Sequence, residues 1–283
     1  MKFNPTALCI ACATIALACA PSSVAQGTAA PLAKLGSTFY DWDALPVAPA
    51  DNGSRRVTAD GSTSTLNRFS IHATTLNPGA SSHPHPQGHA NEEAILIKEG
   101  KIRVILNGVE HPAPVGSLIF LASHVLHNLT NIGDSPATYY VVDFFTDATT
   151  SVPDQPADVW ESAEKLHSTV FDCESLPATP TKAGSRRNVV SSPTATLLEF
   201  ESHLTTLYPG KETGILNGLA DEVIIIKSGL VVATIDGVSA ELGAGSFYFQ
   251  ASRTAHNLKN IGTAPATYQV MKIVSDKTPR SPE

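Results

Sequence analysis

The sequence predicts an all-β protein built from two tandem domains of similar size. Short runs rich in β-branched residues alternate with turn residues along the chain, as in antiparallel sandwiches and barrels. Most runs occur twice: FYDWDALP at residues 39–46 returns as VFDCESLP at 170–177, and PATYYVV from residue 136 returns as PATYQVM from residue 265. A repeat this long indicates two whole domains rather than a solenoid of short units.

Four strands are expected at matched positions in each copy. They are AILIKEG, KIRVILNG, GSLIFLAS and ATYYVVDFF in the first, and VIIIKSG, VVATIDG, GSFYFQAS and ATYQVMKI in the second. Asn107-Gly108 and Asp236-Gly237 each lie between two such runs. Both dipeptides accept positive φ at consecutive positions, so each predicts a tight two-residue hairpin.

The repeat boundaries and the termini divide the chain into five expected segments. The first residues have one lysine, a short apolar run and small residues before Ala25, which is typical of a secretory signal peptide. Cleavage near Ala25 predicts an exported protein, periplasmic or secreted, that keeps Cys173 alone and therefore has no disulfide. The segments are a signal peptide (1–25), a first domain (26–149), a linker that accommodates a short helix (150–168), a second domain (169–275) and a frayed tail (276–283).

The charge balance excludes some partners. The formal net charge is −7, with 16% charged residues. An acidic surface argues against nucleic acid and against an anionic membrane as partners of the mature protein.

One loop gives the two copies different chemistry. The first copy reads LNPGASSHPHPQGHANEEAILIKEG and the second LYPGKETGILNGLADEVIIIKSG, so the histidines of this loop occur only in the first. Glu93 and His127, by contrast, return as Glu222 and His256. Imidazole and carboxylate groups suit divalent transition ions. The first copy therefore predicts a metal site.

The second copy lacks part of that ligand set. Leu216 and Gly218 stand where the first copy has Gln87 and His89. Glu222 and His256 remain, but two ligands are fewer than the three that protein metal sites usually provide. The second domain is therefore expected to bind no metal.

These motifs resemble those of the cupin superfamily, and the resemblance covers both copies. Glu93, six residues and Gly100 match the end of the first cupin motif, while PVGSLIFLASHVLHNLTN matches the second with His127 and Asn131. The resemblance implies a bicupin of two double-stranded β-helix (jelly-roll) barrels, with one divalent ion (Mn, Fe, Ni or Zn) in the first. Because two fused cupins already form the pair that single cupins make as dimers, a monomer or a homodimer is expected.

The ligand set depends on how the loop is counted. Counting forward from Gly79, the first histidine of the motif is His85; counting back from Glu93, the pair is Gln87 and His89. The counts disagree because the first copy holds two extra residues here, and His85 can replace Gln87. Glu93 is also expected to act as a base, and an uncoordinated His85 as a proton shuttle. The preferred metal ligands are Gln87, His89, Glu93 and His127.

Residues present in both copies are interpreted as scaffold. His72 and its counterpart His203 are expected to serve hydrogen bonding rather than proton transfer. The Arg55-Arg56 and Arg186-Arg187 pairs are expected to act as structural clamps. Cys173 replaces Trp42 in the repeat, which favours packing over thiol chemistry.

The implied function is a metal-dependent enzyme on a small organic substrate. The superfamily includes dioxygenases, decarboxylases, isomerases, lyases and hydrolases, and we favour a dioxygenase-type oxidoreductase. The alternative is a non-catalytic protein that binds a sugar or a carboxylate, or a structural bicupin. An accessible site with convergent polar groups would favour catalysis, whereas a barrel filled by apolar side chains would favour binding or a scaffold role.

Overall fold

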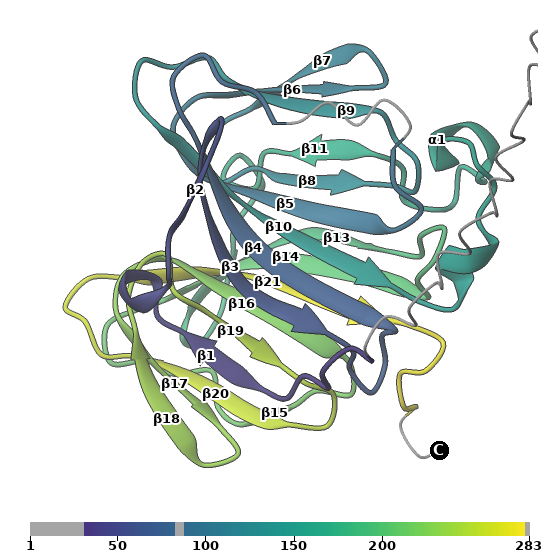
Figure 1. Ribbon diagram of the computed structural model, residues 1–283. Coiled ribbons are helices and arrows are strands. Elements are labelled where there is room, and N and C mark those ends of the chain that lie inside the picture. Colours follow the sequence, from purple (N-terminus) through teal and green to yellow (C-terminus); the bar gives the residue numbers. More distant parts are fainter. Residues whose placement is uncertain (1–30, 83–87, 281–283) are drawn as a thin grey trace, which may run out of the picture. The chain divides into compact units, whose positions relative to one another are not determined.

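Nearly all of the regular structure is β (Figure 1). The computed structural model describes residues 31–82 and 88–280. Each repeat folds into a large and a small antiparallel sheet, which confirms the predicted pair of jelly-roll barrels. The expected signal peptide and its cleavage site lie outside the described residues.

The first barrel has a seven-stranded and a three-stranded sheet, in the orders β11-β8-β5-β10-β4-β3-β2 and β7-β6-β9. The large sheet contains β2 (Ala48–Ala50), β3 (Gly53–Gly61), β4 (Arg68–Leu76), β5 (Glu92–Glu99), β8 (Leu118–Leu121), β10 (Ala137–Phe145) and β11 (Thr169–Phe171). The small sheet contains β6 (Ile102–Leu106), β7 (Val109–Ala113) and β9 (His127–Asn131).

The second barrel has a seven-stranded and a four-stranded sheet, in the orders β1-β19-β16-β21-β14-β13-β12 and β15-β20-β17-β18. The large sheet contains β1 (Thr38–Tyr40), β12 (Thr179–Pro180), β13 (Gly184–Ser192), β14 (Glu199–Leu207), β16 (Asp221–Ser228), β19 (Phe247–Gln250) and β21 (Ala266–Val274). The small sheet contains β15 (Leu216–Asn217), β17 (Val231–Ile235), β18 (Val238–Leu242) and β20 (Ala255–Asn260). All eight strands expected from the sequence are present.

Both predicted hairpins are confirmed. Asn107 and Gly108 join β6 to β7 with φ of 46° and 82°, and Asp236 and Gly237 join β17 to β18 with φ of 46° and 83°. Two consecutive positive φ values define the turn whose twist matches that of the flanking strands. Because the same turn conformation occurs in both copies, we infer that the two turn residues determine how the flanking strands pair.

The segment between the repeats contains the short helix α1 (Ala157–Trp160), and 3-10 turns occur at Trp42–Ala44 and Ala148–Ser151. None of the helices in the described part of the chain has the length and apolarity to cross a membrane.

The two repeats also exchange their first strands. The N-terminal β1 pairs with β19 of the second barrel, and β11 pairs with β8 of the first.

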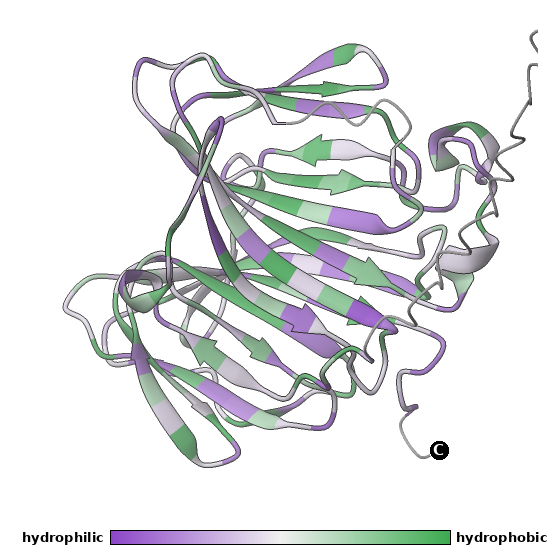
Figure 2. Cartoon of the chain, viewed as in Figure 1, coloured by the Kyte–Doolittle hydropathy of each residue, from purple (hydrophilic) through white to green (hydrophobic). Residues whose placement is uncertain are grey.

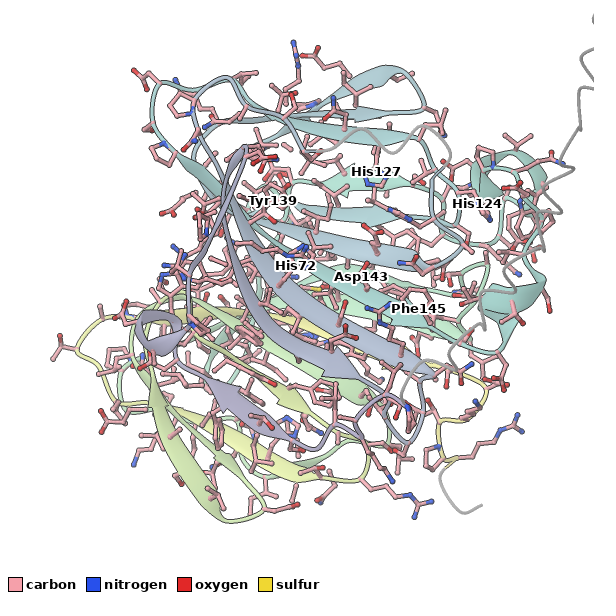
Figure 3. The ribbon with its side chains drawn as sticks, viewed as in Figure 1. His72, His124, His127, Tyr139, Asp143 and Phe145 are labelled. Carbon is pink, nitrogen blue, oxygen red and sulfur yellow. The ribbon has the colours of Figure 1, made fainter. Side chains whose placement is uncertain are left out.

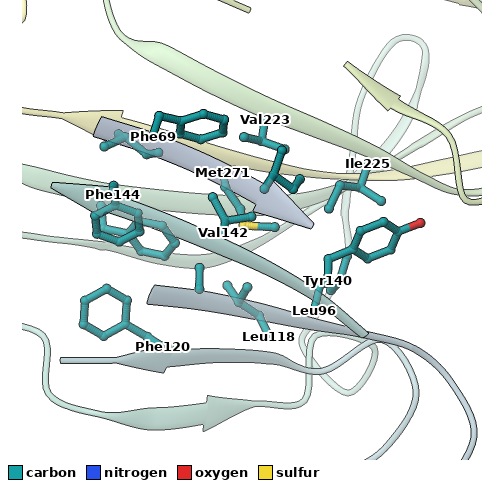
Figure 4. Close-up of a cluster of buried hydrophobic side chains, with 14 of the residues drawn as sticks. Phe69, Leu96, Leu118, Phe120, Tyr140, Val142, Phe144, Val223, Ile225 and Met271 are labelled. Atoms are coloured by element: carbon teal, nitrogen blue, oxygen red, sulfur yellow. The ribbon is translucent and has the colours of Figure 1, made fainter. Parts of the chain in front are cut away.

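The main hydrophobic core lies between the two large sheets (Figure 4). It joins side chains of β4, β5, β8 and β10 to those of β14, β16, β19 and β21, including Phe69, Phe120, Phe144, Phe200 and Phe249. Smaller clusters fill the space between the large and small sheet of each barrel. Because β5 is covered on both faces, its residues 92–97 are all buried, which explains the unbroken apolar run AILI.

Alternation along the strands assigns neighbouring residues to different compartments (Figure 2). On β5, Ala94 and Leu96 belong to the core between the large sheets, whereas Ile95 and Ile97 belong to the core inside the first barrel. Glu92 therefore faces the other repeat, and Glu93 faces the interior of its own barrel.

Two buried acids join the repeats in a reciprocal way. Glu92 accepts hydrogen bonds from the hydroxyl groups of Thr194 (2.5 Å) and Thr196 (2.6 Å) in the second repeat. Asp221, the counterpart of Glu92, accepts them from Thr63 (2.5 Å) and Thr65 (2.6 Å) in the first. Both acids are fully buried. Each large sheet is thus fastened to a loop of the other repeat.

Candidate metal centre

A cavity of about 310 Å³ opens inside the first barrel. Its lining includes three residues predicted from the sequence, namely His89, Glu93 and His127. It also includes His72, Asp143 and Tyr139, which Figure 3 labels together with His127. Gln87 and His85, as well as His83, lie outside the described residues, so their predicted roles stay predictions.

The sheet register places two carboxyl groups side by side in this cavity. Asp143 on β10 pairs with Glu93 on β5 and, on its other side, with Ser70 on β4. The Ser70 hydroxyl donates to Asp143 at 2.8 Å, and the Asn91 amide donates to Asp143 at 3.2 Å. The Asn91 amide also donates to Glu93, at the longer distance of 3.4 Å.

The charge of Asp143 disfavours ionisation of Glu93, whereas the contact with Glu93 lowers the pKa of Asp143. Burial and the neighbouring Asp143 raise the pKa of Glu93, and burial raises the pKa of Asp143 as well. Glu93 is 7% exposed, so water does little to stabilise a second negative charge. A bound cation would remove this conflict, which makes the pair a physical reason to expect one here.

The two histidines approach the cavity from different elements. His127 begins β9, and its Nδ1 lies 3.2 Å from the carbonyl oxygen of Val125. A carbonyl can only accept, so in the neutral ring Nδ1 carries the proton and Nε2 is the basic nitrogen. The ring centroids of His89 and His127 are 6.4 Å apart. The backbone at His89 is held by a 2.6 Å hydrogen bond from the His124 N–H to its carbonyl.

Gly88 makes that loop position possible. Its φ is 61°, and a Cβ at this residue would lie 2.3 Å from the backbone carbonyl carbon of His124. We therefore expect Gly88→Ala to displace His89 and to weaken metal binding about tenfold or more, although no ligand is removed. Titration of the purified variant with Zn²⁺ or Mn²⁺ would measure the loss.

The matched control for Gly88 is Gly79→Ala. Gly79 has a similar φ of 76°, but its Cβ would meet nothing within 4 Å. The Gly79→Ala variant tests the effect of backbone strain without a steric clash, and this variant should retain metal. Equal losses in the two variants would show that strain alone, not the approach to His124, sets the position of His89.

Two residues interpreted as scaffold line the cavity instead. His72 on β4 faces the interior, and burial followed by the charge of Arg55 lowers its pKa to about 3. Its ring is therefore neutral, and its Nδ1 has no hydrogen-bond partner among the described residues. Arg55 also lines the cavity, while Arg56 stacks 4.1 Å from the Trp42 ring and Arg187 donates to the Leu176 carbonyl.

The donor set fits a divalent cation in its chemistry. Two imidazoles and two carboxyl groups meet at one cavity, and such nitrogen and oxygen donors suit Mn²⁺, Fe²⁺, Ni²⁺ or Zn²⁺. Within residues 31–82 and 88–280, no three His, Cys, Asp or Glu side chains are already gathered around one point. Binding would thus require His89 to move toward Glu93 and His127, or a further ligand from the neighbouring loop.

The second barrel has a matching cavity of about 260 Å³ with inverted charge. Lys272 occupies the register position of Asp143: it pairs with Glu222 on one side and Glu201 on the other. Glu201 accepts from the Lys272 ammonium at 2.9 Å and from the Arg186 guanidinium at 2.8 Å. In the first barrel Asp143 lies beside another acid, Glu93, whereas in the second barrel Lys272 and Arg186 donate to the acid Glu201.

The space of the missing histidine is also occupied. A Cβ on Gly218, the counterpart of His89, would lie 2.8 Å from the Gln250 amide nitrogen and 3.0 Å from a Glu222 carboxyl oxygen. Leu216, the counterpart of Gln87, is 47% exposed on β15. The second cavity is therefore rebuilt for different contacts rather than simply stripped of ligands.

Glu201 gives the second barrel a testable pH dependence. Its contact with His203, followed by that with Lys272, lowers its pKa well below the ordinary value of 4.5. A folded-state pKa below the unfolded one means that the carboxylate stabilises the fold above about pH 4.5 and loses this effect as the pH falls. Thermal midpoints of wild type and Glu201→Gln should differ at pH 7, and the difference should shrink steadily as the pH falls below about 4.5. A difference independent of pH would contradict this.

Sequence reasoning did not identify Asp143, Arg55 or Tyr248 as cavity residues. A signal for Asp143 was present: it is the single charge in the strand ATYYVVDFF, and its counterpart in the other copy is a lysine. Arg55 and Tyr248 gave no such signal. Cys173, by contrast, is fully buried in the main core, as its predicted packing role requires.

Comparison with known proteins identifies this fold. Residues 72–143 match the family described as Cupin domain. No curated protein matches the sequence. Ylba from E. coli shares the fold with a TM-score of 0.67 at 12% identity, over 90% of this chain and 97% of Ylba.

Two further solved structures have a similar fold. AerE from Microcystis aeruginosa has a TM-score of 0.62 at 13% identity, over 84% of this chain and 99% of AerE. The oxalate decarboxylase of Lactobacillus farciminis, in a formate complex, has a TM-score of 0.62 at 13% identity, over 88% of each chain. At these identities the likeness concerns the fold. The first barrel therefore contains the match to the cupin domain, and the arrangement of the two barrels is similar to the fold of these three structures.

Proposed function

We propose that the first barrel holds one divalent transition metal and catalyses a reaction of a small organic substrate. The observation that carries this proposal is the buried pair of Glu93 and Asp143 in a cavity that also receives His89 and His127. In the absence of a cation, two buried carboxyl groups in contact destabilise the fold. Their retention in a cavity lined by imidazoles is explained if the site exists to bind a cation.

The proposed metal ligands are His89, Glu93 and His127, with a fourth from the loop residues Gln87 or His85. A metal bound there would polarise an oxygen atom of the substrate as a Lewis acid. Asp143 orients Glu93 through their shared contact, and Ser70 and Asn91 hold Asp143 in place. The protein thus supplies a fixed outer layer of hydrogen bonds behind the donors.

The remaining cavity residues supply substrate contacts. The Arg55 guanidinium suits a carboxylate or other oxyanion of the substrate. Burial raises the pKa of Tyr139 to about 12, so its hydroxyl stays protonated and can donate to a substrate oxygen. Neutral His72, with Nδ1 unpaired among the described residues, can form a hydrogen bond with the substrate. Polar groups that converge on an accessible cavity favour catalysis over a plugged scaffold.

Two reaction types follow from this site. The dioxygenase-type reaction favoured by the sequence stays the first candidate. Decarboxylation is the second, because Arg55 offers a carboxylate contact and an oxalate decarboxylase shares the fold. Incubation of the metal-loaded protein with a panel of small carboxylic acids, including oxalate, distinguishes them: the first consumes O₂ and the second releases CO₂ without net O₂ uptake. Export to the periplasm or outside the cell, and a monomeric or homodimeric state, remain part of the proposal.

The substitution Asp143→Lys tests the metal site. It gives the first barrel the residue that the second barrel already accommodates at the same register position. We expect elemental analysis to find about one metal ion per wild-type chain and none above background in the variant, with unchanged circular dichroism. Lys272→Met is the control and should retain the metal. A wild-type protein that binds none of Mn, Fe, Ni or Zn after reconstitution would refute the proposal.

A further inference from the structure

The second barrel differs from the first by gains as well as losses. At four interior positions it has a polar or charged residue where the first barrel has another type. Tyr248 replaces Ile119 and Gln250 replaces Leu121 on the strand after the hairpin, while Lys272 replaces Asp143 and Glu201 replaces Ser70. Burial of polar side chains costs free energy unless they are satisfied. A barrel that only lost its metal would gain apolar side chains instead.

Two of these residues have a buried side-chain atom without a partner among the described residues, namely the Tyr248 hydroxyl and the Gln250 amide oxygen, and only Tyr248 lines the cavity. The Tyr248 side chain is fully buried and lines the second cavity, yet its hydroxyl makes no hydrogen bond with any described residue. Its pKa lies well above 10 because of burial, so the hydroxyl remains a donor at every physiological pH. A buried donor that faces a cavity without a partner indicates a bound acceptor there.

The charges of the cavity indicate the sign of that acceptor. Lys272 and Arg186 share a single ionised carboxylate, Glu201. The other acid, Glu222, is buried, and burial raises its pKa to about 7, so near neutral pH it is only partly ionised and offsets only part of the remaining positive charge. His203 has a lowered pKa and stays neutral. The cavity therefore has an excess of positive charge that an anionic ligand would balance.

The size of the cavity limits the ligand. A volume of about 260 Å³ corresponds to roughly nine water molecules at their share of liquid volume. Leu258, Ile224 and Val270 add apolar lining beside the polar groups. A short carboxylic acid with a few carbon atoms matches both the size and the mixed lining.

We propose that the second barrel is a metal-independent receptor for a small carboxylate, which contacts the Lys272 ammonium and the Tyr248 hydroxyl. This site is distinct from the metal centre, because it lies in the other barrel and uses residues that the first barrel lacks. It does not depend on the proposed reaction of the first barrel.

The test is isothermal titration calorimetry on the chelator-treated mature chain, with acetate, malonate, succinate and benzoate as probes and succinamide as the uncharged match. We expect at least one carboxylate to bind and succinamide not to bind. Lys272→Met and Tyr248→Phe should each weaken binding about tenfold, Lys272→Arg should largely restore it, and the double variant His89→Ala, His127→Ala should bind as the wild type does.

Three results would overturn the proposal. The first is the absence of binding by every carboxylate up to about 10 mM. The second is equal binding of succinamide, which would indicate an uncharged ligand. The third is loss of binding in the His89, His127 double variant with full binding in Lys272→Met, which would place the carboxylate in the first barrel. Tyr248→Phe removes one hydroxyl from a fully buried ring, so it keeps the test valid if a lysine variant fails to fold.

Discussion

The double substitution His89→Ala, His127→Ala is expected to abolish metal binding and to lower any metal-dependent activity by at least about 10³-fold. Both imidazoles line the cavity of the first barrel, and His127 is held in one tautomer by the Val125 carbonyl. Without them, Glu93 is the one proposed ligand left among the described residues, and a single carboxylate cannot retain an ion against a chelator. Elemental analysis after dialysis against a chelator measures the loss.

The repeat supplies a matched control for this experiment. His256 is the counterpart of His127 and lines the corresponding cavity of the second barrel. His256→Ala removes an equally buried imidazole, yet it should leave metal content unchanged because Gly218 and Lys272 replace the other donors. If His256→Ala lost as much metal as the double variant, the ion could not be assigned to the first barrel alone.

The second large effect concerns the reciprocal acids between the repeats. Glu92→Ala leaves the hydroxyl groups of Thr194 and Thr196, which now donate to Glu92 at 2.5 and 2.6 Å, without an acceptor in a buried place. Each unsatisfied buried group costs about 1–3 kcal/mol, so the free energy of unfolding should fall by about 2–5 kcal/mol. Asp221→Ala should act in the same way through Thr63 and Thr65. Urea unfolding followed by circular dichroism gives both values.

Two comparisons make the result specific. Glu110→Ala removes an exposed acid from β7 and should change stability by less than about 0.5 kcal/mol. Replacing Glu92 and Thr196 together by apolar residues should cost less than Glu92→Ala alone, because the Thr196 hydroxyl is then no longer present as a donor without an acceptor. A larger loss in the combined variant would mean that packing, not hydrogen bonding, holds the repeats at this point.

The sequence predicted the fold well because its signals are local and occur twice. The hairpins at Asn107 and Asp236 follow from the backbone preference of two adjacent residues, and the strands from runs of four to nine residues. The exchange of β1 and β11 between barrels was not predictable in this way. The sequence of a three-residue strand does not indicate which strand it pairs with, because that pairing is decided by the packing of whole sheets.

The site was predicted in part. His89, Glu93 and His127 were recognised by residue type and spacing, and they line one cavity. Asp143, Arg55 and His72 come from β10, β3 and β4, which are distant in sequence from the histidine loop. Only antiparallel register brings Asp143 beside Glu93 and the other two into the same cavity, and register depends on contacts across the sheet.

The sequence by itself determined the all-β class, the two repeats, their turns and the loss of histidines from the second copy. The tertiary structure alone decided which acid faces which compartment. Glu92 and Glu93 are adjacent and chemically equal, but the pleat directs one toward the other repeat and the other into the cavity. It likewise decided that Lys272 takes the place of Asp143, so that the second cavity carries positive charge rather than none. Charges act through space, and only the folded sheets define which charges are neighbours.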